Sequence, residues 1–226
     1  MKKYFAPVSL AVLITAAFLY LSPHFIHPPI EKPELPLLPE VNLEVPFYPQ
    51  APDGNWDMPW QEACEESATT LAYFYATAQD LTKDTFRARI LEIVDWENKT
   101  YGYFEHTNMD ETARILAEVY NYSNFEIVRN ITAKDLKKAL SERKVIIAPF
   151  AGRLLGNPFY SGEGPYYHAM VIKGYGDGKF ITHDVGTKRG EDYAYDEETL
   201  MNALHDWHDD DITKGNKTVI VVSPSA

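Results

Sequence analysis

The chain has 226 residues, of which 45% are hydrophobic and 24% are charged, a composition that suits a globular protein with a substantial core. Its 33 acidic residues outnumber its 21 Lys and Arg residues, and the formal net charge of −12 disfavours nucleic acid as a partner. The single cysteine excludes both an internal disulfide and a cysteine-rich zinc module.

The first residues form a candidate membrane segment. Lys2 and Lys3 precede an apolar run from Tyr4 to Leu21, which is just long enough to cross a bilayer as a helix. The small residues 15–17 offer a signal-peptide cleavage site, but cleavage there would leave an apolar stretch on the mature chain. We therefore favour an uncleaved anchor over residues 1–22, ahead of a cleaved signal peptide or a buried helix. The lysines then predict a single-pass protein of the cell membrane with its domain outside the cytoplasm, or a secreted protein if the segment is cleaved.

A proline-rich segment follows the apolar run. Six prolines lie within residues 23–44, which disfavours a helix and favours an extended, semi-rigid linker. Residues 45–226 show no internal repeat and are expected to form one domain.

Helical patterns dominate the first half of this domain. Apolar residues recur at helical spacing, Thr82 is a candidate N-cap, and Asn108 opens an Asn-x-x-Glu capping pattern. We expect helices over residues 61–79, 82–96, 108–120 and 132–142.

The second half is predicted to consist mainly of strands. Apolar runs predict strands over residues 144–150, 168–175, 179–184 and 217–223, and residues 196–207 resemble one late helix. The sequence Tyr175-Gly176-Asp177-Gly178 predicts a turn that joins two of these strands as a hairpin. Helices followed by an antiparallel sheet indicate the α+β class.

Cys64 lies where the first helix is expected to begin. Backbone N–H groups at a helix N-terminus stabilise an anion, so a thiol at this position can become acidic and nucleophilic. A free cysteine is nevertheless more often a small buried hydrophobic residue, and its position alone leaves both interpretations open.

His168 and Asp184 are predicted to lie side by side. His168 opens one strand of the expected hairpin and Asp184 ends the other, so the turn brings them to the same edge of the sheet. A carboxylate at this position can orient the imidazole, leaving its other nitrogen to act on a thiol. His183 alternates to the opposite face of its strand and is the weaker candidate.

Three sequence blocks in a fixed order carry a family resemblance. The first is Val45-Pro46-Phe47-Tyr48-Pro49-Gln50 with Trp56 and Gln61-x-x-Cys64-Glu65-Glu66; the second is His168-Ala169-Met170-Val171-Ile172-x-Gly174-Tyr175; the third is Phe180-Ile181-Thr182-His183-Asp184. Together they resemble the C-39-like cysteine peptidases, which are papain-fold relatives of the proteases that process bacteriocin leaders. The resemblance implies N-terminal helices that carry the cysteine and a C-terminal antiparallel sheet that carries the histidine and aspartate. It also implies hydrolysis of peptide or related amide bonds.

The chain departs from this family pattern after the nucleophile. Many members have Cys-Gly-Pro, whereas this chain has Cys64-Glu65-Glu66, and a carboxylate facing the site would raise the pKa of the thiol. Papain-like enzymes also use a glutamine to stabilise the oxyanion. Gln61 is only three residues from the cysteine, so we prefer Gln50, which matches the family's Val-Pro…Gln position.

The leading hypothesis is a membrane-tethered thiol hydrolase that acts on a peptide or protein substrate. Cys64 attacks the carbonyl, His168 transfers the proton, Asp184 orients His168, and Gln50 stabilises the oxyanion. The alternative is a catalytically inactive papain-like domain that binds peptides. We expect no cofactor and no metal, since the acidic run 209–211 and the pair His205 and His208 have the character of a solvated surface. The sequence gives no indication of the oligomeric state.

Overall fold

The computed structural model describes residues 37–225. The predicted anchor, residues 1–22, and most of the predicted linker lie outside the described residues. Within the described part, no helix is both long enough and apolar enough to cross a membrane.

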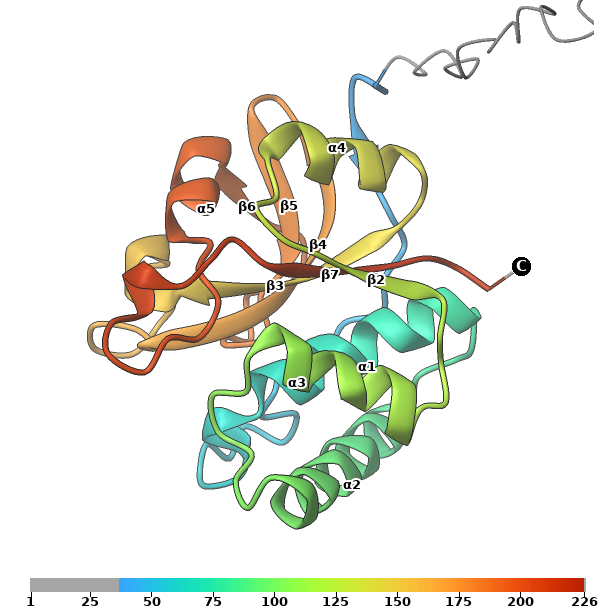
Figure 1. Ribbon diagram of the computed structural model, residues 1–226, viewed down its shortest axis with the longest axis vertical. Coiled ribbons are helices and arrows are strands. Elements are labelled where there is room, and N and C mark those ends of the chain that lie inside the picture. Colours follow the sequence, from blue (N-terminus) through green and yellow to red (C-terminus); the bar gives the residue numbers. More distant parts are fainter. Residues whose placement is uncertain (1–36, 226) are drawn as a thin grey trace, which may run out of the picture. The chain divides into compact units, whose positions relative to one another are not determined.

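The strands of the described chain form one seven-stranded antiparallel sheet (Figure 1). The path through the sheet runs β2-β7-β3-β4-β5-β6, and β1 pairs with β4 beside this path. The strands are β1 (Val41–Asn42), β2 (Phe125–Val128), β3 (Val145–Ala151), β4 (Tyr167–Gly176), β5 (Lys179–His183), β6 (Tyr193–Asp196) and β7 (Val219–Val222).

The helices cover both faces of the sheet. Figure 1 shows α1, α2 and α3 on one side and α4 and α5 on the other, and α1 packs directly on β3 and β4. The helices are α1 (Cys64–Thr77), α2 (Lys83–Thr100), α3 (Met109–Arg114), α4 (Ala133–Ser141) and α5 (Glu197–Ala203). The α+β class predicted from the sequence is confirmed.

Side-chain caps define where three of the helices begin. Thr82 caps α2, while Asn108 and Thr132 form complete capping boxes at α3 and α4. The predicted starts of these helices are therefore confirmed. The predicted first helix begins later than expected, because residues 60–62 form a separate 3-10 turn and α1 starts at Cys64.

The predicted C-terminal boundary of the late helix is wrong. The pattern predicts a helix to residue 207, but α5 stops at Ala203 and the backbone of Leu204 is extended. Leu204 forms a β-bridge with Phe150, and the N–H of His205 donates to the carbonyl of Pro149. The C-terminal end of β3 thus takes the hydrogen bonds that further helical turns would have used.

Three short strands were not expected from the sequence. β1 lies at the end of the segment predicted as linker, where Val41 and Asn42 pair with β4. β2 and β6 have only four residues each, too few for a clear alternating pattern.

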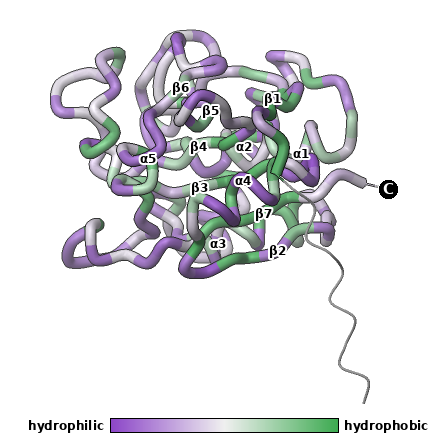
Figure 2. The backbone as a smooth tube through the Cα atoms, turned by 90° about the horizontal axis from the view of Figure 1, so that it is seen from above, coloured by the Kyte–Doolittle hydropathy of each residue, from purple (hydrophilic) through white to green (hydrophobic). Residues whose placement is uncertain are grey.

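The hydrophobic core lies on both faces of the central strands, against α1 on one face and against α4 and α5 on the other. Every residue of β3 is buried, as are all but the last residue of β4. Figure 2 shows hydrophobic backbone segments along β3 and β7 and hydrophilic ones in the surrounding loops. Two-sided burial accounts for the continuous apolar runs from which these strands were predicted.

The hairpin between β4 and β5 turns at Asp177 and Gly178. Gly176 pairs with Lys179, and both intervening residues have positive φ, 49° at Asp177 and 73° at Gly178. Positive φ at both positions is the geometry of a type I′ turn, which Asp-Gly favours. The predicted hairpin is confirmed, and it sets the register that places the ends of β4 and β5.

Candidate active site

Cys64 is the first residue of α1. Ala63, at the N-cap position, has no side chain that can cap the helix, so the first backbone N–H groups have no side-chain cap. The partial positive charge at this end of the helix favours an anion. The side chain of Cys64 is buried but lies on the wall of a cleft.

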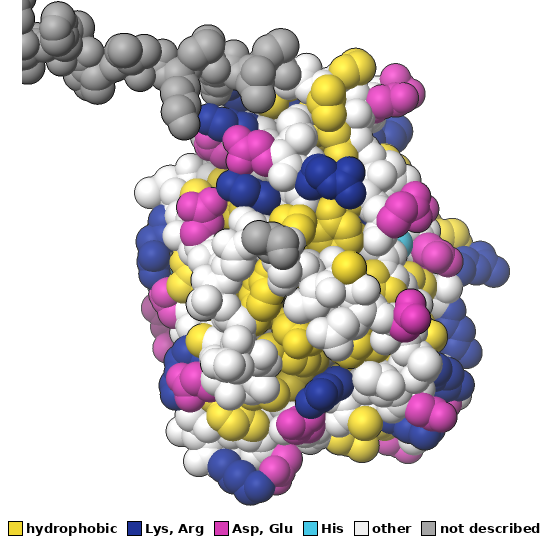
Figure 3. Space-filling model, turned by 90° about the vertical axis from the view of Figure 1, so that its right-hand side faces the viewer, with side chains coloured by type: hydrophobic (Ala, Val, Ile, Leu, Met, Phe, Trp, Pro, Cys, Tyr) yellow, Lys and Arg dark blue, Asp and Glu magenta, His cyan; other side chains and the backbone are white. Residues whose placement is uncertain are grey.

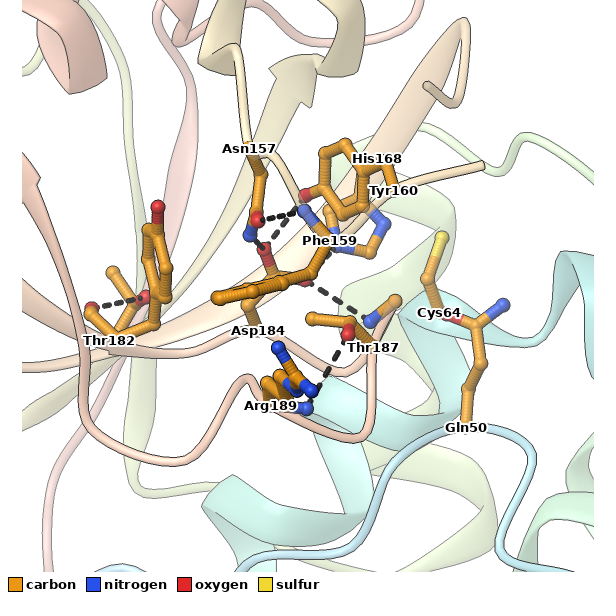
Figure 4. Close-up of polar contacts among 12 residues, drawn as sticks. Gln50, Cys64, Asn157, Phe159, Tyr160, His168, Thr182, Asp184, Thr187 and Arg189 are labelled. Carbon is orange, nitrogen blue, oxygen red and sulfur yellow. Dashed lines mark hydrogen bonds and ion pairs between the residues drawn. The ribbon is translucent and has the colours of Figure 1, made fainter. Parts of the chain in front are cut away.

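His168 and Asp184 form a buried pair, as the hairpin predicts. The Nε2 atom of His168 is 2.8 Å from Oδ1 of Asp184, and the two side chains are only 2% and 0% exposed. Because Nε2 is engaged by Asp184, Nδ1 is the imidazole nitrogen left to face a thiol. Figure 4 shows Cys64 beside the His168 ring.

Asp184 is anchored by more groups than the sequence indicates. Its Oδ2 atom accepts hydrogen bonds from the hydroxyls of Tyr160 and Tyr195, at 2.7 and 2.6 Å, and from the amide of Asn157 at 2.9 Å. The backbone N–H of Gly186 donates to Oδ1 at 3.0 Å. The carboxylate is thus fixed in both position and orientation.

These contacts keep Asp184 ionised. Burial alone would raise the pKa of its carboxyl, but the charge and hydrogen bond of His168 and the two tyrosine hydroxyls outweigh burial and lower the pKa to about 2. A permanent carboxylate at Nε2 fixes the orientation of the imidazole and leaves Nδ1 available to act on a thiol.

Gly186 allows the chain after β5 to pass directly over this pair. A Cβ atom at this position would lie 2.9 Å from Cε1 of His168 and 3.2 Å from Oδ1 of Asp184. A side chain here would push the imidazole out of place.

The cleft beside Cys64 has a volume of about 850 Å³. Cys64 and His168 lie on its walls, together with Gln50 and Gly186. The cleft is rimmed by aromatic and charged side chains, among them Trp56, Glu62, Phe159, Tyr166, Lys188 and Arg189. Such a cleft can accommodate an extended peptide against the sulfur atom.

Gln50 lies beside Cys64, but its amide nitrogen is engaged elsewhere. Nε2 donates to the backbone carbonyls of Trp60 and Gln61, both at 2.9 Å, while Oε1 is buried without a partner in the described residues. In this arrangement both N–H groups are used to hold the turn before α1. Gln61 also lines the cleft, and its exposed side chain donates to Glu62.

Glu65 makes a direct contact with the sulfur of Cys64. Sγ and Oε2 of Glu65 lie 2.8 Å apart, and the Glu65 side chain is completely buried. Burial raises the pKa of the Cys64 thiol well above its ordinary value, and a negative charge on Glu65 raises it further. The acidic residue that departs from the family pattern therefore faces the sulfur.

Two more buried carboxyls lie behind Glu65. Glu66 of α1 and Glu97 of α2 face each other, and their oxygens have no donor group as partner within residues 37–225. Burial raises the pKa of Glu66 well above its usual range and that of Glu97 to about 8.

His183 lies away from this pair, as its alternation along β5 predicts. Its Nε2 contacts the carbonyl of Val45 at 2.9 Å, and its Nδ1 accepts from the N–H of Asp192. Burial lowers its pKa to about 4, so the ring is neutral and supports the fold.

Asn157, Tyr160 and Tyr195 were not found from the sequence. Tyr195 could have been inferred if the short strand β6 had been recognised, because it is the residue that β6 turns inward. Asn157 and Tyr160 lie in the irregular loop after the 3-10 turn 152–155, where no periodic pattern marks them.

The chain thus combines helices and one antiparallel sheet with a cysteine and a His–Asp pair beside one cleft. Residues 42–210 match the model of the Peptidase_C39 like family, so the chain belongs to this family. A solved structure from Bacillus anthracis, described as a "putative C39-like peptidase", shares the fold with a TM-score of 0.57 and 12% sequence identity. That match covers 83% of this chain and 98% of the other. No curated protein matches the chain.

Proposed function

We propose that the protein is a cysteine peptidase that cleaves peptide or related amide bonds with Cys64 as nucleophile. The observation that carries the proposal is the buried His168–Asp184 pair, which leaves Nδ1 of His168 facing the cleft at the start of α1. The buried polar network around Asp184 fixes the orientation of one imidazole. Catalysis requires such an orientation, whereas folding of the domain does not.

Each residue has a distinct task in the proposed reaction. His168 takes the thiol proton, the Cys64 sulfur attacks the substrate carbonyl carbon, and the imidazolium then protonates the leaving amine. Water hydrolyses the thioester in the second half of the cycle, with His168 again as the base. Asp184 holds the ring in orientation throughout.

The developing oxyanion needs hydrogen-bond donors beside the sulfur. The backbone N–H of Cys64, at the uncapped start of α1, is one donor. Gln50 is the second, and it must release the carbonyl of Trp60 or Gln61 to make that bond.

The proposed location is outside the cytoplasm, with the protein tethered to the cell membrane. The support is the apolar run from Tyr4 to Leu21 behind two lysines, followed by the proline-rich residues 23–44. A tether of this kind would restrict the peptidase to substrates near the membrane surface.

A peptide library tests the activity directly. The purified protein is incubated with peptides of diverse sequence, and cleavage is compared with that by Cys64→Ala. We expect defined products from the wild type and none from the variant. Equal product formation by both proteins would exclude Cys64 as the nucleophile.

The contact between Cys64 and Glu65 favours a second candidate function, a peptide-binding domain without turnover. If Glu65 carries a charge, the thiol remains protonated and unreactive. Labelling of Cys64 by a thiol probe near neutral pH, lost in His168→Ala, supports the peptidase. An inert thiol in both proteins supports the binding domain.

A further inference from the structure

We propose that Glu65 is a further catalytic residue, an uncharged carboxylic acid that donates its O–H to the Cys64 sulfur as the thiolate forms. This inference deepens the proposed function, because it requires that Cys64 acts as a nucleophile. It turns the departure from Cys-Gly-Pro into part of the mechanism.

The geometry places the carboxyl group on the reacting atom itself. Oε2 of Glu65 is 2.8 Å from Sγ of Cys64, while the other oxygen, Oε1, has no partner among the described residues. Glu65 is 0% exposed, so water does not compete for the contact. In the resting state the Cys64 thiol donates to Oε2 of Glu65. Once the thiol loses its proton, the carboxyl group must either donate to the sulfur or repel it as an anion.

The surroundings of Glu65 decide between these two roles. The titratable groups that face it are Cys64 and Glu66 on α1, Glu62 on the preceding turn, Glu97 on α2 and Tyr167 on β4. Carboxyl, thiol and phenol groups are either neutral or negatively charged, so none of these groups can supply a positive charge to Glu65. Behind them, Glu105 and Glu111 act on Glu66 and Glu97 and add further negative charge.

A buried carboxyl without a cation keeps its proton. Desolvation raises the pKa of Glu65 well above its usual range, and the neighbouring Glu66 raises it further. With Glu65 neutral, the repulsion that would hold Cys64 as a thiol is absent. A hydrogen bond from a carboxylic acid to a thiolate is instead charge-assisted and strong.

The proton balance is simple. The S–H proton of Cys64 passes to Nδ1 of His168, and Glu65 keeps its own proton while sharing it with the sulfur. When the sulfur attacks the carbonyl its negative charge passes to the oxyanion, and the Glu65 O–H loses its charged partner. Ionisation of Glu65 at high pH would remove the donor and place a second negative charge against the sulfur.

Alkylation of the only cysteine measures this effect without a substrate. The rate of reaction with iodoacetamide is followed against pH for the full chain and for Glu65→Gln, Glu65→Met and His168→Ala. Glu65→Gln keeps a donor that cannot ionise, whereas Glu65→Met fills a similar volume without one. Glu97→Gln is the control, since it removes a buried acid of the same cluster that does not touch the sulfur.

Burial raises the pKa of the Cys64 thiol, and the start of α1, His168 and the Glu65 O–H must together outweigh it. We therefore expect the wild-type inflection to lie below the ~8.5 of a free cysteine. Glu65→Met should move it upward by about one to two pH units, the effect of losing one hydrogen bond to a charged group, and slow alkylation about 10- to 100-fold at lower pH. Glu65→Gln and Glu97→Gln should stay close to the wild type. The infrared carbonyl band of a protonated carboxylic acid should be present at neutral pH and lose intensity in Glu65→Gln.

Three results would overturn the inference. An unchanged inflection in Glu65→Met means that Glu65 does not act on the sulfur, and a lower inflection in either Glu65 variant means that Glu65 is a repelling anion. After either of these two results, the proposed function would still hold if the wild-type inflection lies at a pH below the free value and rises in His168→Ala. A wild-type inflection at or above the free value, insensitive to His168→Ala, would overturn both proposals together.

Discussion

At the scale of single residues, the site holds two buried carboxyls in opposite environments. Asp184 accepts hydrogen bonds from five groups, including the ring of His168, and its pKa falls to about 2. Within residues 37–225, Cys64 is the only side chain that forms a hydrogen bond with Glu65, and burial raises the pKa of Glu65. Burial is common to both, so their hydrogen-bond partners decide the charge that each one carries.

Substitution of Cys64 and His168 tests the proposed pair. Cys64→Ser and His168→Ala should each reduce hydrolysis to background, and the double variant should be no worse than either, because residues that act as a unit are not additive. Asp184→Ala should retain a residual rate, since Asp184 orients the ring and takes no part in bond making. Initial rates on a cleaved library peptide provide the measurement. Additive losses in the double variant would contradict a shared step.

The two glutamines are separated by a second experiment at this scale. Gln50→Ala should lower kcat by roughly 10²–10³-fold, the usual cost of one oxyanion donor, while Gln61→Ala should do much less. Gln50 also donates to the carbonyls of Trp60 and Gln61, so the unfolding midpoint of the Gln50→Ala variant must be measured in parallel. A fall in kcat with an unchanged midpoint assigns the loss to the oxyanion. The reverse ranking of the two variants would assign that role to Gln61.

At the scale of secondary structure, the elements that carry Cys64, His168 and Asp184 were predictable. Strong local signals define them: the apolar runs of β4 and β5 and the Asp-Gly turn that fixes their register. The contacts of Asp184 with Asn157, Tyr160 and Tyr195 were not predictable, since they join an irregular loop and a four-residue strand through tertiary packing. The sequence also left open whether the Glu65 side chain faces the site or the surface. An acidic residue in the first turn of a helix interacts favourably with the helix dipole in either position.

The interface between α1 and α2 predicts a pH-dependent stability. Glu97 of α2 is fully buried, and its pKa of about 8 lies above its ordinary value of 4.5. The native state therefore binds this proton more tightly than the unfolded chain does. The resulting stability is complete below about pH 4.5 and is lost as pH rises toward 8.

Glu97→Gln should remove much of this dependence. We expect the variant to be more stable than the wild type at pH 8, by on the order of 1–3 kcal/mol, and to differ less at pH 5. Urea unfolding at a series of pH values gives the comparison. Glu92→Gln, on the exposed face of the same helix, is the matched control and should follow the wild type. If the free energy of unfolding changes with pH in the same way for all three proteins, Glu97 does not titrate in this range.

At the scale of the whole molecule the net charge is negative, yet the cleft carries two exposed cations. The chain carries a net charge of −12, and the face shown in Figure 3 intersperses both signs. At the cleft, Lys188 and Arg189 are exposed, and within residues 37–225 neither forms an ion pair. The guanidinium of Arg189 lies 4.8 Å from the ring centre of Phe159, on the same rim.

These two cations predict faster cleavage of acidic peptides. Lys188→Gln with Arg189→Gln should lower kcat/KM for peptides that carry Asp or Glu near the cleaved bond by roughly 10-fold at low salt, and neutral peptides much less. The difference should shrink as ionic strength rises, because salt screens the attraction. Arg89→Gln with Lys99→Gln, on α2 and paired with nearby acids, is the control. Equal losses for acidic and neutral peptides would exclude charge recognition by this rim.

The N-terminal residues give the last prediction, which concerns where the molecule acts. An apolar run of this length behind two lysines should partition into a bilayer, whereas a peripheral protein held by charge is released by salt or carbonate. We therefore expect the full chain to remain in the membrane fraction through a carbonate wash and a protease added from outside to reach the domain. Replacing two central leucines, Leu10→Arg and Leu13→Arg, should release the protein, because each charge at the centre of a span costs about 2.5–3.5 kcal/mol. Leu37→Arg, an exposed position in the folded part, is the control and should stay bound. Recovery of a soluble wild-type form that begins near Phe18 would instead show a cleaved signal peptide and a secreted peptidase.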